Sequence, residues 1–255
     1  MDSNAFERRM RSLEAFHALR CLPGAWIVLR VDGRGFSRFT ATRFQKPFDA
    51  AFHALMLQTA QALLEDMQGC YAYTESDEIS VLFPPGWDQF DREVEKLVSI
   101  SAGIATAAFT HAAGTPAHFD SRVWLGTTSE DVVDYFCWRQ DDATRCALNG
   151  WCYWTLRKAG RSAGQATTTL KQQTIAFKNE LLFQHGINFN ELPAWQRRGA
   201  GLLWQHYEKT GHDPIRNQPV TVTRRRIAVD EELPVKVEYA AFIRHILEAA
   251  RPPDS

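Results

Sequence analysis

The pattern of apolar and polar residues predicts helices alternating with short strands. Apolar residues three and four positions apart, as at Phe6, Met10 and Leu13, are typical of a helix that buries one face. We expect helices over residues 5–19, 49–67, 88–111, 128–160, 178–185 and 235–250. Short apolar runs bounded by glycine, proline or acidic residues are typical of strands. We expect strands over residues 26–31, 70–74, 79–83, 118–125, 200–208 and 218–228.

The order of these elements predicts an α+β fold. Residues 1–127 follow the order β-α-β-β-α-β after an N-terminal helix, which is the ferredoxin-like arrangement. Its first and third strands are antiparallel neighbours at the centre of the sheet, so Asp32 and Asp77 are expected to meet at one sheet edge. Residues 128–255 predict a helical and strand extension. Because no linker rich in Gly, Ser or Pro lies near 127, we expect the extension to pack on the first domain as one unit.

Composition restricts the class of protein. Apolar residues make up 45% of the 255 residues, which excludes disorder of the whole chain, and the net charge of −1 requires any RNA contact to use local basic clusters. The five Cys without a CxxC motif are typical of buried reduced thiols, and the eight His lack zinc-ligand spacings. With neither a signal peptide nor an apolar run of about 18 residues, we expect a cytoplasmic protein without membrane contact.

The two aspartates lie in turns that suit metal binding. Converging carboxylates favour Mg²⁺, and two such ions about 4 Å apart can clamp a displacement at phosphorus. The Gly33 carbonyl could be a further ligand, and the backbone N–H groups of residues 33–36 could cradle a triphosphate. Arg30 and Lys46 could neutralise phosphate charge. The alternative is that Asp32-Gly33 is only a turn and that Asp77 lies in an ordinary hairpin.

Several motifs resemble those of the tRNA(His) guanylyltransferase family. They occur in the family's order: Arg30-Val31-Asp32-Gly33-Arg34-Gly35-Phe36-Ser37-Arg38-Phe39, Lys46-Pro47, Tyr73-Thr74-Glu75-Ser76-Asp77-Glu78-Ile79-Ser80, Phe119-Asp120-Ser121-Arg122-Val123, Trp138-Arg139-Gln140-Asp141, Lys178-Asn179-Glu180 and Asn190-Glu191-Leu192-Pro193. The resemblance implies a polymerase-palm domain that adds nucleotides to tRNA in the 3′→5′ direction. The tRNA 5′ end would be activated with ATP or GTP, and the 3′-OH of an incoming NTP would attack it.

The resemblance also implies a role for individual residues. Asp32, Gly33 and Asp77 would hold two Mg²⁺ ions, and Glu78 would be an acidic neighbour that supports the catalytic site. The residues implied in nucleotide binding are Arg30, Gly33, Arg34, Gly35, Phe36, Lys46, Ser76, Arg92 and Lys96, the last two on one basic helix face. Lys178 is implied in activity and Asn190 at the tRNA end. The family further implies a homo-oligomer, a tetramer or a dimer.

One segment departs from the family pattern. Family members that add only G₋₁ to tRNA(His) carry His-Ile-Asn-Asn-Leu-Tyr-Asn, and the matching place here is Thr144-Arg145-Cys146-Ala147-Leu148-Asn149-Gly150. The departure resembles bacterial and archaeal members that repair 5′-truncated tRNAs, so we expect repair. The alternatives are obligate G₋₁ addition, a palm-type nucleotide cyclase, and an inactive RNA-binding module on the same scaffold.

Basic and aromatic residues in the second half are candidates for RNA contact. Arg197 and Arg198, with Arg224, Arg225 and Arg226, suit phosphate contacts, and the alternative is a solvated or ion-paired face. Trp195, Trp204 and Tyr207 could stack on bases, although we favour core packing. The apolar face of the N-terminal helix docks either on its own chain or on a partner subunit.

Overall fold

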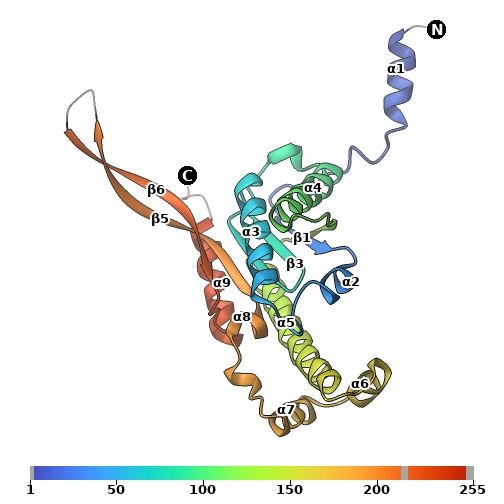
Figure 1. The fold of residues 1–255 in the computed structure, drawn as a ribbon. Helices are drawn as coiled ribbons and strands as arrows, with labels where there is room; N and C mark the ends of the chain where they lie inside the picture. The colour runs from blue at the N-terminus through green and yellow to red at the C-terminus, as the bar shows by residue number, and fades with distance from the viewer. Residues whose placement is uncertain (1–2, 214–217, 251–255) are drawn as a thin grey trace.

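The structure is a computed structural model that describes residues 3–213 and 218–250. Its centre is a six-stranded sheet in the order β4-β1-β3-β2-β5-β6, and every neighbouring pair is antiparallel (Figure 1). The strands are β1 (Trp26–Gly33), β2 (Tyr71–Glu75), β3 (Glu78–Phe83), β4 (Phe119–Gly126), β5 (Ala200–Asp213) and β6 (Gln218–Asp230). The first four strands confirm the expected ferredoxin-like unit, with β1 and β3 paired at its centre.

Helices cover both faces of this sheet. The helices are α1 (Ser3–Ser12), α2 (Phe36–Ala41), α3 (Ala50–Asp66), α4 (Val94–Ala113), α5 (Ser129–Lys158), α6 (Ala163–Leu170), α7 (Ile175–Gln184), α8 (Ala194–Arg198) and α9 (Lys236–Ala250). Two short 3₁₀ turns, η1 (Gln89–Arg92) and η2 (Phe189–Glu191), complete the described secondary structure. None of these helices has both the length and the apolar character needed to cross a bilayer.

Side-chain alternation along β1 separates two cores. Ile27, Leu29 and Val31 pack with residues of α3 and α4, whereas Trp26 and Val28 pack with residues of α5 and α9. Asp32 continues the second set, because successive residues of a strand point to opposite faces. The alternation therefore directs the Asp32 carboxylate to the α5 side of the sheet. A third core lies around the second half of α5, with α6, α7 and η2.

The second half of the chain packs on the first, as expected. Strand β5 extends the sheet by pairing with β2, and the Tyr73 hydroxyl donates to the carbonyl of Arg198 over 2.9 Å. The amide of Gln140 donates to the carbonyl of Pro234 over 3.0 Å. These contacts join α8 to β2 and α5 to the loop between β6 and α9.

Several predicted boundaries were wrong. The first helix ends at Ser12 rather than 19, and the helix expected from 88 begins at Val94 because Phe90, Asp91 and Arg92 have positive φ. Short helices α2 and α6 were not predicted, and α7 begins at 175 rather than 178. The expectation of a frayed tail over 251–255 lies outside the described residues.

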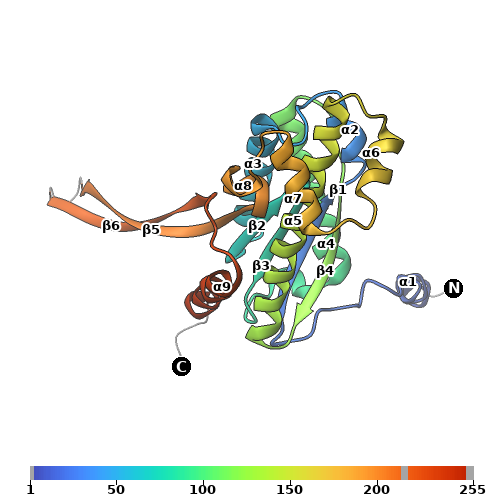
Figure 2. The ribbon, with the colours of Figure 1, turned by 90° about the horizontal axis from the view of Figure 1, so that it is seen from below.

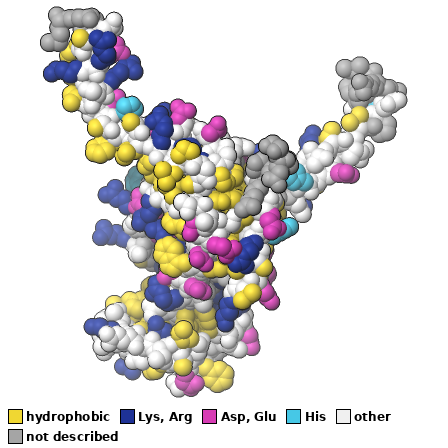
Figure 3. Space-filling view, turned by 180° about the vertical axis from the view of Figure 1, so that it is seen from behind, with side chains coloured by type: hydrophobic (Ala, Val, Ile, Leu, Met, Phe, Trp, Pro, Cys, Tyr) yellow, Lys and Arg dark blue, Asp and Glu magenta, His cyan; other side chains and the backbone are white. Residues whose placement is uncertain are grey.

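Two segments extend from opposite sides of the body (Figure 2). One is the long β5–β6 hairpin and the other is α1 with the chain that follows it. Leu13 and Phe16 are 71% and 68% exposed, so the apolar face of this segment does not dock on its own chain. Figure 3 shows apolar and basic side chains together on this N-terminal segment. Of the cysteines, Cys21 and Cys152 are buried but Cys146 is exposed, which corrects the expectation of buried thiols throughout.

Candidate functional site

Asp32 and Asp77 lie together at the edge of the sheet, as the topology predicted. Asp32 is the register partner of Glu78 on β3 and of Asp120 on β4. The N–H of Gly33 donates to the carbonyl of Asp77 over 3.0 Å, which ties the end of β1 to the β2–β3 turn. Four acidic residues from three strands and one turn therefore surround this point.

The electrostatics of the two aspartates suit a bound cation. Burial raises the pKa of Asp77, and repulsion from Asp32 adds to this effect, while a 3.0 Å hydrogen bond from Ser76 opposes it. Burial and the charge of Asp120 raise the pKa of Asp32. Charged carboxylates that repel one another at a buried edge are stabilised by a divalent ion with oxygen ligands. Within the described residues, no three His, Cys, Asp or Glu side chains are arranged to hold a metal.

The turn after β1 requires its glycines. A Cβ on Gly33 would lie 2.5 Å from the ring of Phe36, and Gly35 has a φ of 73° and caps α2. The expected N–H cradle of residues 33–36 is only partly available, because the N–H groups of Gly33 and Arg34 donate to Asp77 and His118. The N–H groups of Gly35 and Phe36 lie at the start of α2, and in the described structure neither has an acceptor.

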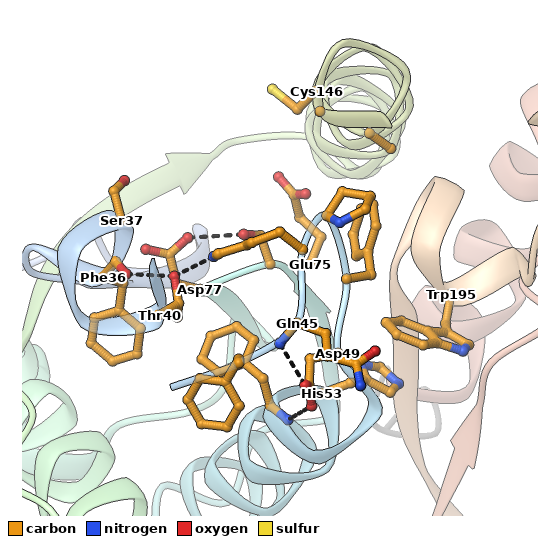
Figure 4. Close-up of a pocket in the computed structure, with 18 of the residues that line it drawn as sticks. Phe36, Ser37, Thr40, Gln45, Asp49, His53, Glu75, Asp77, Cys146 and Trp195 are labelled. Atoms are coloured by element: carbon orange, nitrogen blue, oxygen red, sulfur yellow. Dashed lines mark hydrogen bonds between the residues drawn. The ribbon is translucent and has the colours of Figure 1, made fainter. Parts of the chain in front are cut away.

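A cavity lies beside Asp77 and is closed by segments from both halves of the chain (Figure 4). Its polar end carries Lys46, Ser76 and Asp77, and its aromatic end carries Phe48 and Trp195. The Lys46 ammonium donates to the Thr40 hydroxyl, which in turn donates to the carbonyl of Phe36. Burial lowers the pKa of Lys46, and the carboxylates of Asp77 and Asp49 oppose this shift. The helix α5 lines the cavity with Trp154 and with the small residues Ala143, Cys146, Ala147 and Gly150.

A buried arginine holds the acidic residues behind this cavity. Arg139 on α5 is 5% exposed and makes a two-bond contact to Glu78, with N–O distances of 2.7 and 2.9 Å. The same guanidinium lies 3.5 Å from Glu75 and 3.3 Å from Asp142. Burial raises the pKa of Glu75 to about 8, repulsion from Glu78 adds to this shift, and Arg139 opposes it.

Arg139, Glu75 and Asp120 were not predicted as site residues. Arg139 belongs to one of the family-like motifs, but helical periodicity does not say which strand its side chain faces. Asp120 could have been found from the strand order, because the residue opposite Asp32 on β4 follows from the register. Glu75 directly precedes Ser76 in the β2–β3 turn and was read only as part of a motif.

Arg92 is not part of a basic helix face, which corrects the prediction. It lies before α4 with a φ of 57° and is 8% exposed. Its guanidinium donates to four backbone carbonyls, those of Leu22, Ala25, Pro85 and Trp87. The side chain is therefore committed to joining the loops around β1 and η1. Lys96 is exposed near the start of α4, 3.5 Å from Glu93, and does not line the cavity.

The other predicted residues lie outside the cavity. Lys178 is on α7, where its carbonyl contacts the Cys152 thiol at 3.3 Å, and Asn190 is exposed in η2. Arg197 donates to the Leu192 carbonyl over 2.8 Å, and Arg198 lies 3.6 Å from Glu232. Their roles in activity and in tRNA binding stay predictions.

Aromatic and basic residues of the second half have distinct environments. The ring of Trp195 stacks on His53, with centroids 4.1 Å apart, and the His53 imidazole lies 2.7 Å from Glu231. Trp204 is packed against the core, as favoured, and Arg225 lies over its ring. Tyr207 is 38% exposed, which contradicts core packing for that residue.

Comparison with known proteins matches most of the chain to family models. Residues 7–127 match the family model described as tRNAHis guanylyltransferase, and residues 130–244 match the one described as Thg1 C terminal domain. A probable tRNA(His) guanylyltransferase of Mus musculus is 33% identical over 209 residues, covering 77% of this chain and 70% of the relative. One of Dictyostelium discoideum is 32% identical over 222 residues, covering 82% and 85%.

A solved structure is similar over almost the whole chain. It is described as a bacterial tRNA(His) guanylyltransferase (Thg1)-like protein in complex with GTP. The match has a TM-score of 0.72 and 25% identity, and it covers 95% of this chain and 99% of the other. The similarity therefore includes both halves of the fold.

Proposed function

Because the chain belongs to the tRNA(His) guanylyltransferase family, and so to the nucleotidyltransferases, we propose that it adds nucleotides to the 5′ end of tRNA in the 3′→5′ direction. The observation that carries this proposal is the cavity, whose polar end carries Lys46 and Asp77 and whose aromatic end carries Trp195. A nucleoside triphosphate matches that polarity, with its phosphates toward Lys46 and Asp77 and its base toward Trp195. The bacterial Thg1-like neighbours in complex with GTP and with ATP support nucleotide binding.

Asp32 and Asp77 would hold Mg²⁺ together with the Gly33 carbonyl. Mg²⁺ bound there supplies charge neutralisation at phosphorus and aligns the attacking hydroxyl. Glu78 supports the site from the next strand, where Arg139 fixes its carboxylate. Lys46 and the free N–H groups at the start of α2 would bind phosphate oxygens, and Ser76 orients Asp77 through its hydrogen bond. Catalysis would then consist mainly of positioning and charge neutralisation.

The altered segment bears on which tRNA is used. Cys146, Ala147 and Gly150 of this segment line the cavity, where the strict G₋₁-adding pattern has asparagines. We propose that these smaller and less polar residues relax recognition and permit repair of 5′-truncated tRNAs. Obligate G₋₁ addition is the second candidate, and the names of the relatives from Mus musculus and Dictyostelium discoideum favour it.

An assay of 5′ extension of tRNA distinguishes the two candidates. The purified protein is incubated with ATP, GTP and Mg²⁺ and either a 5′-truncated tRNA other than tRNA(His) or a tRNA(His) that lacks G₋₁. We expect addition to the truncated tRNA at a rate at least equal to that on tRNA(His), read as added length on a sequencing gel. A strong preference for tRNA(His) lacking G₋₁ would support the second candidate instead.

The exposed N-terminal segment supports an oligomer. Phe6, Leu13, Phe16 and Leu19 are between 48% and 71% exposed, and a helix as short as α1 is marginal in water without a packed face. We propose that this face contacts a second copy of the chain.

A further inference from the structure

An exposed tryptophan lies near Asp32 on the α5 side of the sheet. Trp138 is 52% exposed, and the guanidinium carbons of Arg30 and Arg139 lie 5.6 and 4.7 Å from the centre of its ring. Arg30 precedes Asp32 by two residues on β1, so both side chains leave the same face of the sheet. The two cations hold the ring in position, and about half of the residue stays open to solvent.

The course of α5 leaves the neighbouring part of β4 uncovered. The helix first passes over β4, where the ring of Tyr135 packs on that of Trp124 with centroids 4.7 Å apart. One turn later, Arg139 contacts Glu78 on β3, so the helix has moved away from β4. Arg122 lies two residues before Trp124 on the same face of β4, and its side chain is 53% exposed.

The uncovered part of β4 brings positive charge to Asp32. Arg122 is the register partner of Arg30, and Asp120 is the register partner of Asp32. Arg122 lies 3.1 Å from Asp120. Burial and the charge of Asp120 raise the pKa of Asp32, whereas the charge of Arg122 lowers it. Arg30, Arg122 and Trp138, which we call the Trp138 surface, therefore combine an open aromatic ring with guanidinium groups beside Asp32.

The Trp138 surface and the cavity lie at different members of the aspartate pair. Asp77 lines the cavity, whereas Asp32 lies beside Arg30 and Arg122. In transfer at phosphorus the attacking and leaving oxygens are roughly in line, so two substrates approach the phosphorus from different sides. With a nucleoside triphosphate in the cavity, the Trp138 surface is left for the RNA 5′ end.

We propose that the Trp138 surface binds the 5′-terminal nucleotide of the RNA, with its base stacked on the indole ring and a backbone phosphate against Arg122. This inference rests on the proposed function. Stacking on an aromatic side chain tolerates any base, and a guanidinium matches the oxygens of a phosphate. The surface would therefore hold an RNA 5′ end beside Asp32 whichever nucleotide it carries.

A second copy of the chain is the other class of partner for an exposed ring. Charged residues are depleted at the centre of protein interfaces, whereas Arg30 and Arg122 lie directly beside Trp138 and Asp32. The charge of the surface therefore favours RNA, and the test includes the oligomeric state.

The first part of the test compares variants of the surface. The dissociation constant of a 5′-truncated tRNA is measured by fluorescence anisotropy at increasing KCl concentrations. We expect Trp138→Ala to weaken binding about tenfold and Trp138→Phe to weaken it less, because a phenyl ring still stacks. Arg122→Gln should reduce the slope of log K against log salt by about 1. Arg244→Gln is the matched control and should equal the wild type, because Arg244 is also exposed and ion-paired, to Glu130 at the start of α5.

The second part uses a tRNA whose 5′-terminal nucleotide is abasic, which removes only the base. Wild-type protein should bind this RNA about tenfold more weakly than the intact one. Trp138→Ala should bind both RNAs equally, because the stacking contact is already lost. The ATP affinity and the oligomeric mass of the Trp138 variants, measured by calorimetry and light scattering, should match those of the wild type.

Four results would overturn the inference. An unchanged RNA affinity for Trp138→Ala, while the wild type still extends tRNA, would do so and leave the proposed function intact. An equal loss by Trp138→Ala on intact and abasic RNA would show that Trp138 supports the fold of the site and does not stack on the base. A changed oligomeric mass of Trp138→Ala would place a second copy of the chain on this surface. A wild-type protein that does not bind tRNA would contradict the proposed function and this inference together.

Discussion

A single buried positive charge, that of Arg139, balances negative charge at the site. Arg139 is surrounded by Glu75, Glu78 and Asp142 and lies 4.7 Å from the ring of Trp138. One guanidinium therefore compensates the Glu78 and Asp142 carboxylates beside the end of the sheet and also lies close to Glu75. Breaking a buried ion pair by removing one partner is strongly destabilising, because the other charge stays buried without compensation.

Replacing Arg139 should destabilise the fold. We expect Arg139→Met to lower the free energy of unfolding by about 3–5 kcal/mol, because Glu78 loses both of its close hydrogen bonds. Urea unfolding followed by circular dichroism measures this change. Arg145→Met, at a side chain that is 70% exposed, is the matched control and should cost less than about 1 kcal/mol. Equal stability of the two variants would show that Arg139 is not the compensating charge.

The raised pKa of Glu75 predicts a pH dependence of stability. The folded protein keeps the Glu75 proton up to about pH 8, whereas the ordinary pKa is 4.5, so the folded state binds more protons between these values. Glu75 therefore ionises in the unfolded state before it does so in the folded state, and the free energy of unfolding falls progressively as the pH rises from about 4.5 to about 8. In EDTA, we expect Glu75→Gln to be more stable than the wild type by a margin that widens over this range.

The Glu75 prediction is checked by urea unfolding at several pH values. Glu65→Gln, at an exposed position on α3, is the control and should show no widening margin. A margin for Glu75→Gln that stays constant with pH would contradict the assigned pKa.

At the scale of elements, the turn from β1 into α2 positions Asp32 against Asp77. A side chain at Gly33 would displace Phe36, whose ring packs against Phe109 and Phe119 at centroid distances of 5.2 and 4.9 Å. The Phe36 ring thus couples the turn after β1, the helix α2 and the aromatic core.

Two glycine substitutions should have opposite signs. We expect Gly33→Ala to destabilise the protein by about 1–3 kcal/mol, because its Cβ would overlap the Phe36 ring. Gly103 lies within α4, and a Cβ added there would meet no neighbouring side chain or element within 4 Å, so Gly103→Ala should stabilise by about 0.5–1 kcal/mol. Thermal melting of both variants tests this, and a neutral Gly33→Ala would contradict the close packing of this turn.

The pairing of strands was predictable, but the packing of helices was not. Asp32 and Asp77 met because the order of elements determines which strands are neighbours and therefore which turns share an edge. Arg139 and Trp195 reach the site through the angle at which α5 and α8 pack, and periodicity does not define that angle. The helix α6 had a usable signal, since Ser162 and Gln165 form a capping box, whereas α4 began late because the chain turns through positive φ.

At the scale of the whole molecule, the cavity exists because the two halves of the chain pack together. His53 and Asp77 come from the first half, whereas Cys146 and Trp195 come from the second. The stack of Trp195 on His53 and the contact of His53 with Glu231 join them at the aromatic end. Nucleotide binding should therefore require both halves, since the second half supplies Trp195 at the aromatic end and the α5 wall of the cavity.

We propose above all that Asp32 and Asp77 form the metal centre for nucleotidyl transfer. It is tested most directly by incubating a labelled 5′-truncated tRNA with NTPs and Mg²⁺ and measuring the rate of 5′ extension by wild-type protein, Asp77→Asn and the exposed control Asp66→Asn. We predict a loss of at least about 10³-fold for Asp77→Asn, with an unchanged circular dichroism spectrum, and wild-type activity for Asp66→Asn. Extension by Asp77→Asn within about tenfold of the wild-type rate would contradict the claim.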